Sequence, residues 1–146
     1  MFTAIYHTGY LTDDLSGAID LFRKAFGGTV IAEVPASDGG RMAYLKVGSA
    51  EVEVIEPRDQ SRLGGRKGLV LDHVGYAVAD LDVAIAELQA RGVRFQTARP
   101  TTNAVGQRMI YVDPSTSGGA KMHLTEVGTE VRTEVGTEVR TEVRPS

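Results

Sequence analysis

Two stretches of this sequence share a pattern that decides the fold. The first, HTGYLTDDLSGAIDLF, runs from His7 to Phe22, and the second, HVGYAVADLDVAIAEL, runs from His73 to Leu88. Seven of the sixteen aligned positions are identical, namely His, Gly, Tyr, Asp, Leu, Ala and Ile. Self-similarity on this scale indicates two copies of one structural unit.

The similarity continues beyond these stretches. RMAY at 41–44 aligns with RMIY at 108–111, and AEVEVIE at 50–56 aligns with AKMHLTE at 120–126. A polar segment rich in Gly and Arg, 58–68, separates the copies. The repeat therefore predicts two modules, at about 3–57 and 69–126.

Each module is expected to fold as βαβββ. Its first strand carries the histidine, an aspartate caps the following helix, and apolar residues at helical spacing precede a closing glycine. The cap is Asp13 or Asp14 in the first module and Asp80 in the second. The strands are expected at 3–11, 29–34, 41–47 and 50–55, and at 69–79, 93–96, 107–113 and 121–125. One module cannot close a core alone, so we predict an α+β fold in which tandem βαβββ modules form a curved eight-stranded mixed sheet with a central cavity.

Composition excludes several classes of protein. The chain has 146 residues, no cysteine and a net charge of -3. Disulfides and thiolate metal sites are thereby excluded, and no basic excess favours nucleic acid or an anionic membrane. No apolar run reaches the roughly 20 residues of a membrane span, and the N-terminus lacks the pattern of a signal peptide. We expect a cytoplasmic protein.

The C-terminus is a simple repeat. From Thr125 the four-residue unit TEV[GR] occurs five times, ending at Arg144. With one small apolar side chain per unit, the repeat offers too little burial to offset the entropy of ordering. We predict a folded domain over 1–127 and a disordered tail over 128–146, whose removal after Val127 should leave the melting temperature unchanged. The alternative is an edge strand that pairs with another chain.

Four polar residues occupy matched positions in the repeat. His7 aligns with His73, and Glu53 aligns with His123; each lies within a predicted strand among apolar residues. The chain has only three histidines, and all occupy these positions. If the sheet curls, three imidazoles and a carboxylate converge on one point, a donor set that suits a divalent metal. The alternative for each histidine is a hydrogen-bonded core residue.

The repeated units, the histidine that opens each one and the strand EVEVIEP at 51–57 resemble the vicinal oxygen chelate superfamily over residues 3 to 126. That superfamily includes glyoxalase I, methylmalonyl-CoA epimerase, extradiol dioxygenases and bleomycin- and fosfomycin-resistance proteins. Within that superfamily, the short sequence motifs of this chain are most similar to those of methylmalonyl-CoA epimerases and their glyoxalase-like relatives. The resemblance implies a homodimer that acts on a small-molecule substrate.

The resemblance also implies a ligand set. The family's first-strand histidine falls on His7, its first-module carboxylate or amide on Glu53, and its second-module histidine on His73. The final-strand position, usually glutamate, falls on His123, because Glu126 is three residues further and faces away by strand alternation. Glu56 and Glu126 are interpreted as rim residues. In the region that matches 35–39, the resemblance to the epimerases implies an E-x-G motif whose glutamate acts as a base. This chain has Ser37 at the position of that glutamate.

The implied function is that of a metal-dependent isomerase, epimerase or lyase of the glyoxalase type. Its divalent ion (Zn, Ni, Co, Fe or Mn) stabilises an enolate while a nearby group moves a proton. Glu53 and His123 are the predicted catalytic residues. The matched Tyr44 and Tyr111 are expected to line the cavity or pack in the core. Arg41 and Arg108 are interpreted as solvated strand ends or, alternatively, as a grip for an anionic substrate.

Two other functions stay open. An Fe(II) ring-cleaving dioxygenase would use two histidines and a carboxylate, which His7, His73 and Glu53 could supply. A metal-free binding protein of the antibiotic-resistance type would lack metal ligands and have aromatic walls. This chain keeps three histidines and is only 6% aromatic, so a metalloenzyme is the favoured hypothesis.

Overall fold

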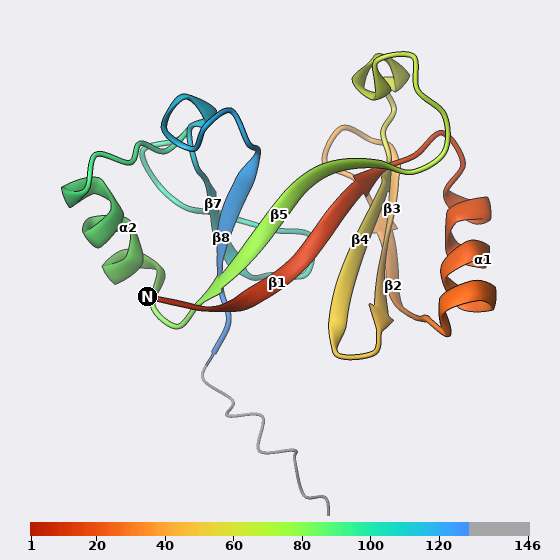
Figure 1. Cartoon of the computed structure of the whole chain (residues 1–146), viewed down its shortest axis with the longest axis horizontal. Coiled ribbons are helices and arrows are strands. Elements are labelled where there is room, and N and C mark those ends of the chain that lie inside the picture. Colours follow the sequence, from red (N-terminus) through yellow and green to blue (C-terminus); the bar gives the residue numbers. More distant parts are fainter. Residues whose placement is uncertain (129–146) are drawn as a thin grey trace, which may run out of the picture.

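A computed structural model of the chain describes residues 1–128 (Figure 1). The predicted tail lies outside the described residues, apart from Gly128. Its disorder, and the effect of its removal, therefore stay predictions.

The described residues form one eight-stranded sheet in the order β2-β3-β4-β1-β5-β8-β7-β6. The first module consists of β1 (Phe2–Leu11), α1 (Leu15–Phe26), β2 (Thr29–Pro35), β3 (Arg41–Val47) and β4 (Ala50–Glu56). The second consists of β5 (Val70–Val78), α2 (Leu81–Ala90), β6 (Thr101–Thr102), β7 (Arg108–Tyr111) and β8 (Met122–Glu126). Two short 3-10 helices, η1 (Gln60–Leu63) and η2 (Pro114–Thr116), lie in connections. The predicted α+β fold of two βαβββ modules is confirmed.

The two modules join through their first strands. β1 pairs with β5 antiparallel, while β1 pairs with β4 and β5 with β8 in parallel, so the sheet is mixed. In Figure 1, β1 and β5 cross the middle of the molecule, and α1 and α2 lie at opposite ends. Equivalent positions of the repeat thus face each other across the β1–β5 pair.

Each helix begins and packs as the sequence predicts. Asp14 caps α1 by accepting from the Gly17 N–H, and Asp80 caps α2 by accepting from the Val83 N–H. Asp13, the other predicted cap, instead accepts from the Gly68 N–H. Two core clusters result, each lying between one helix and its own module's strands: Leu15, Ala18, Ile19, Ala43, Leu45, Val52 and Val54, and Val78, Leu81, Ala84, Leu88, Ile110 and Leu124. No helix within residues 1–128 has the length and apolar character to cross a membrane.

One strand prediction is wrong. Residues 93–96 form no strand; Phe95 makes only an isolated bridge to Val112, and the edge strand of this module is β6. Between them the chain leaves the sheet and reaches Pro100, which has no N–H to donate to a ladder. The second module therefore has the two-residue strand β6 at its edge, where the first module has the seven-residue strand β2.

The two arginines expected at solvated strand ends are exposed there, and each also forms an ion pair. Arg41 forms an ion pair with Glu56 (2.9 Å), whose Oε2 accepts from the Leu15 N–H at the start of α1 (2.7 Å). In the second module Arg108 pairs with Glu126, whose Oε1 accepts from the Leu81 N–H of α2. The rim interpretation of these glutamates is thus corrected: each ties the last strand of a module to its helix.

We expect Glu56→Ala to lower the free energy of unfolding by about 1 to 2 kcal/mol, because the first N–H of α1 loses a charged acceptor. The hydrogen bond from Leu15, followed by the contacts with Arg41, holds the pKa of Glu56 below its usual range. A lowered folded pKa gives stability that is present above the unfolded pKa and lost as the pH falls through the folded one. Wild-type stability should therefore fall more steeply on acidification than that of Glu56→Gln in urea titrations; parallel curves would contradict this assignment.

Candidate metal centre

Four neighbouring strands bring the four predicted ligands together. Glu53 lies on β4, His7 on β1, His73 on β5 and His123 on β8. All four side chains are buried, with relative exposures of 7%, 3%, 2% and 2% respectively. Residues far apart in sequence therefore form one compact polar cluster, here called the His-Glu cluster.

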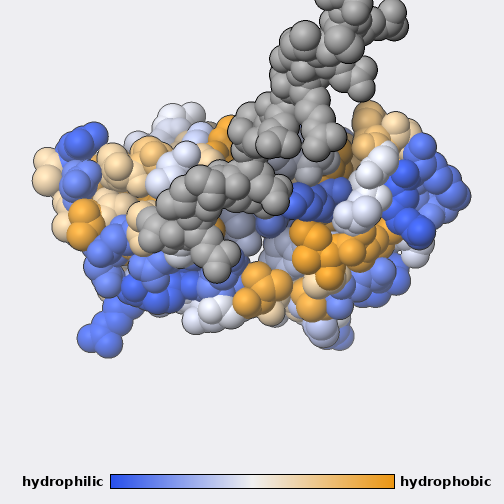
Figure 2. Space-filling view, turned by 90° about the horizontal axis from the view of Figure 1, so that it is seen from below, coloured by the Kyte–Doolittle hydropathy of each residue, from blue (hydrophilic) through white to orange (hydrophobic). Residues whose placement is uncertain are grey.

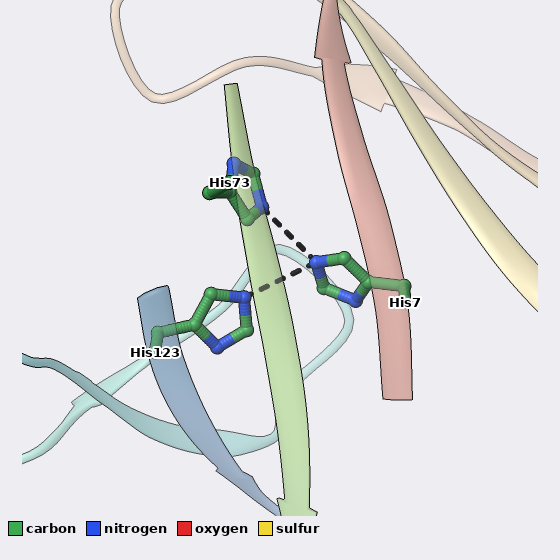
Figure 3. A group of neighbouring side chains, drawn as sticks. All are labelled: His7, His73 and His123. Atoms are coloured by element: carbon green, nitrogen blue, oxygen red, sulfur yellow. Dashed lines mark hydrogen bonds between the residues drawn. The ribbon is translucent and has the colours of Figure 1, made fainter. Parts of the chain in front are cut away.

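The three imidazoles meet through the same ring atom. Figure 3 shows the rings of His73 and His123 directed toward His7. The Nε2 atom of His7 lies 3.1 Å from Nε2 of His73 and 3.1 Å from Nε2 of His123. One ligand atom from each histidine lies within 4.8 Å of the other two.

Glu53 completes the cluster and has a partner for each oxygen. Its Oε2 lies 2.9 Å from His73 Nε2 and 3.2 Å from His7 Nε2. Its Oε1 accepts a hydrogen bond from the Tyr44 hydroxyl at 3.2 Å. One oxygen therefore faces the imidazoles, while the other is fixed by a buried phenol on β3.

Two glycines give the rings their space. Gly9 of β1 lies opposite Glu53 on β4 and opposite His73 on β5, whereas Gly75 of β5 lies opposite His7 on β1 and His123 on β8. A Cβ atom at Gly9 would lie 2.5 Å from both ring nitrogens of His73, and one at Gly75 would lie 2.6 Å from Cε1 of His123. The repeated His-x-Gly motif thus supplies a predicted ligand and the space for the predicted ligands on the neighbouring strands.

Outer partners orient two of the rings. His73 Nδ1 lies 2.8 Å from Asp72 Oδ2, which also accepts from Lys121 Nζ at 2.6 Å. His123 Nδ1 lies 3.0 Å from the hydroxyl of Thr125. Among residues 1–128, His7 Nδ1 is the buried side-chain nitrogen or oxygen with no hydrogen-bond partner.

Asp72 and Thr125 are functional-site residues that were not among those predicted from the sequence. Asp72 precedes a ligand, so regular strand alternation would turn the two side chains apart. Thr125 follows His123 by two residues and therefore shares its face, a signal that was present in the sequence.

The cluster shifts the ionisation of its members. Burial would raise the pKa of Glu53, but hydrogen bonds with His7 and His73 lower it well below its usual range. Burial likewise opposes the charged form of His73, yet its hydrogen bonds with Asp72 and Glu53 raise its pKa. For His123, burial and then the charges of His7 and His73 lower the pKa to about 3. Glu53 is therefore ionised and His123 neutral at neutral pH.

These donors fit a divalent metal ion. A carboxylate only accepts hydrogen bonds, so Asp72 and Glu53 favour a proton on each ring nitrogen of His73 in the metal-free protein. A bound ion would take the place of the Nε2 proton, and the Nδ1–H would stay directed at Asp72. Neutral His123 can likewise offer its Nε2 lone pair to an ion while its Nδ1 contacts the Thr125 hydroxyl. Three imidazole Nε2 atoms thus converge, and one carboxylate oxygen lies against two of them, a set typical of first-row transition metals and zinc.

The other predicted residues lie around or away from the cluster. The ring of Tyr44 lies 6.4 Å from that of His7, and Tyr111 lies 5.2 Å from His123, so both tyrosines border the imidazoles. Burial, followed by the charge of Glu53, raises the pKa of Tyr111 to about 12. Glu126 binds the N-terminus of α2, and Ser37 is exposed in the turn between β2 and β3.

Fold and cluster together define a member of a known superfamily. The family model of the glyoxalase/bleomycin resistance protein/dioxygenase superfamily matches residues 6–111, and the chain belongs to this superfamily. The resemblance seen in the sequence is thereby confirmed.

Comparison with individual proteins identifies similar members of this superfamily. Mitochondrial methylmalonyl-CoA epimerase of Bos taurus is 24% identical over 126 residues, which cover 82% of this chain and 72% of the bovine protein. The crystal structure of methylmalonyl-CoA epimerase from Mycobacterium tuberculosis matches with a TM-score of 0.78 and 26% identity, covering 86% of this chain and 88% of that one. Streptomyces coelicolor methylmalonyl-CoA epimerase in complex with 2-nitronate-propionyl-CoA matches with a TM-score of 0.76 and 25% identity, covering 86% and 98%.

Proposed function

We propose that this chain is a metal-dependent epimerase that acts on a small acyl-CoA thioester of the methylmalonyl-CoA type. The observation that carries the proposal is the His-Glu cluster, in which the imidazoles of His7, His73 and His123 converge and Glu53 contacts the first two. The similarity to methylmalonyl-CoA epimerases supports the substrate class, as does the thioester analogue held by the Streptomyces coelicolor protein.

In this proposal the four residues hold a divalent ion, with zinc, nickel, cobalt, iron or manganese as the expected metals. When bound, the ion supplies positive charge beside a substrate oxygen on which negative charge develops as a carbon-bound proton leaves. His123 acts as a ligand rather than as a base, because its Nε2 faces His7 within the cluster and its Nδ1 contacts the Thr125 hydroxyl. This narrows the catalytic role first predicted for His123.

Glu53 is the residue proposed to carry the proton. It is the one member of the His-Glu cluster with a second basic oxygen, Oε1, and that oxygen is directed toward Tyr44 rather than toward the imidazoles. The C–H bond of the acyl group breaks, its electron pair moves into the enolate, and the proton passes to the carboxylate. The enolate then takes a proton from solvent on its opposite face, and Glu53 releases the proton that it received to solvent, which completes epimerisation.

The proposal is tested by metal titration combined with isotope exchange. Protein purified without a histidine tag is loaded with each metal and incubated with methylmalonyl-CoA in deuterated water. We expect deuterium at C2 of the acyl group with loaded protein and none with chelated protein. Absence of any bindable metal would refute the proposal in favour of a metal-free binding protein, and bound metal without exchange would point to another reaction of the superfamily.

Glu53→Gln separates the two roles of this residue. The amide keeps an oxygen for the metal but cannot accept the proton, so we expect zinc affinity within about tenfold of wild type and exchange slowed by about 100-fold or more. Calorimetric titration and the exchange assay measure the two quantities. Wild-type exchange in Glu53→Gln would assign the proton transfer to another group.

We also propose a homodimer, as the family resemblance implies. Three large hydrophobic side chains on the paired strands β1 and β5 are exposed: Phe2 (48%), Ile5 (62%) and Leu71 (60%). In Figure 2 a group of hydrophobic residues lies just to the right of the middle of the face, beside the hydrophilic right-hand end. Exposed apolar groups of this kind mark association surfaces; sedimentation as a monomer at micromolar concentration would contradict the dimer.

A further inference from the structure

The ladder between β1 and β5 is irregular next to both of its histidines. Gly9 lies opposite His73, but the next residue, Tyr10, lies opposite Leu71, so Asp72 has no partner across the ladder. In the same way, Ile5 lies opposite Tyr76 and His7 opposite Gly75, so Tyr6 is the extra residue. Asp72 and Tyr6 therefore occupy matched positions of the repeat, each immediately before a ligand.

A β-bulge turns the extra residue out of regular alternation, and bulges often re-aim a side chain beside a functional site. In β5 the consequence is the contact between neighbours: Asp72 Oδ2 lies 2.8 Å from Nδ1 of His73. The bulge in β1 has a different result. The Tyr6 hydroxyl donates to Gln107 (2.9 Å), and Nδ1 of His7 stays without a partner.

A lysine also binds the carboxylate that contacts His73. Lys121, one residue before β8, donates from Nζ to the same Oδ2 of Asp72 at 2.6 Å. The side chains of His73 and Asp72 are 1% and 13% exposed, whereas Lys121 is 35% exposed. The ammonium group thus compensates a largely buried carboxylate and fixes the oxygen that faces the ring.

We propose that Asp72, presented by the bulge in β5 and held by Lys121, is a positioning residue that keeps a proton on Nδ1 of His73 and directs Nε2 into the His-Glu cluster. This inference rests on the proposed metal site. A histidine ligand whose second nitrogen donates to a carboxylate is oriented and made more basic, and loss of such a partner costs about 10- to 100-fold in metal affinity.

The test follows the Nδ1–H proton of His73 by NMR on 15N-labelled protein, both metal-free and loaded with zinc, together with zinc affinity by competition with a chelator. We expect wild type to show a slowly exchanging Nδ1–H signal in both forms. In Asp72→Ala this signal should disappear, and zinc affinity should fall about 10- to 100-fold. The matched control is Asp13→Ala, which also removes an aspartate paired with a lysine, Lys67 at 3.1 Å, but away from the histidines.

Asp72→Asn keeps an oxygen acceptor of similar shape and guards against a variant that does not fold. Hydrogen bonds to neutral acceptors are roughly half as strong as those to ions, so this variant should keep the Nδ1–H signal with faster exchange and lose less zinc affinity. The inference is overturned if Asp72→Ala retains both the signal and the affinity of Asp13→Ala. Failure of wild type to bind zinc would refute the proposed function alone, because the signal in metal-free protein still decides the role of Asp72.

Discussion

His123→Ala is expected to lower zinc affinity by an order of magnitude or more, whereas Glu126→Ala should leave it nearly unchanged. His123 contributes one of the three imidazole nitrogens of the His-Glu cluster, and its Nε2 lies 3.1 Å from that of His7. Glu126 occupies the same strand three residues later, but its carboxylate accepts from the Leu81 N–H and pairs with Arg108. Removing Glu126 therefore affects the start of α2 rather than the metal.

The identity of this ligand also predicts the metal preference. A divalent ion held by three neutral imidazoles and one carboxylate leaves a site charge of about +1, whereas a second carboxylate would leave none. Imidazole nitrogens favour Zn, Ni, Co and Fe over ions that prefer oxygen ligands. We expect His123→Glu to restore metal binding relative to His123→Ala and to shift the preference toward manganese.

Titration of the three variants with zinc and manganese, followed by calorimetry, measures both effects. The circular dichroism spectrum of each variant shows whether the fold is retained. Loss of the metal in Glu126→Ala but not in His123→Ala would mean that Glu126, not His123, is the final ligand.

The sequence predicted the fold and the members of the cluster because both follow from the repeat. The offset between the copies pairs His7 with His73 and Glu53 with His123, and antiparallel pairing of β1 with β5 brings these pairs to one point. Strand alternation alone was enough to choose His123 rather than Glu126 as the predicted ligand on the last strand. Periodicity and symmetry are properties of the chain, so they can be read from it.

What the sequence did not predict depends on departures from regular pairing. The side chain of Asp72 meets its neighbour only because the ladder slips by one residue at that point. The break of the edge strand before β6 likewise depends on how the chain leaves the sheet between Phe95 and Thr101. Arg41 and Arg108 were interpreted singly, although their partners Glu56 and Glu126 are matched in the same repeat, so these ion pairs could have been inferred.

Gly9→Ala should remove both metal binding and part of the stability, although it adds a single methyl group. The backbone of Gly9 has no positive φ, so alanine meets no conformational penalty there. The conflict is steric, because the new Cβ would lie 2.5 Å from both nitrogens of the His73 ring. The ring cannot yield without losing its contact with Asp72. We expect zinc affinity to fall at least tenfold and the free energy of unfolding to fall by about 1 to 3 kcal/mol, the usual cost of overpacking.

The size of the loss should depend on the ring itself, which a double-mutant cycle can measure. In a His73→Ala background the added methyl group meets no imidazole, so Gly9→Ala should cost little stability there. Thr8→Ala, one residue earlier and on the opposite face of β1, serves as the control and should leave zinc affinity unchanged. An equal loss of stability from Gly9→Ala in both backgrounds would show that the glycine is required by the backbone of β1 and not by the histidine that lies over it.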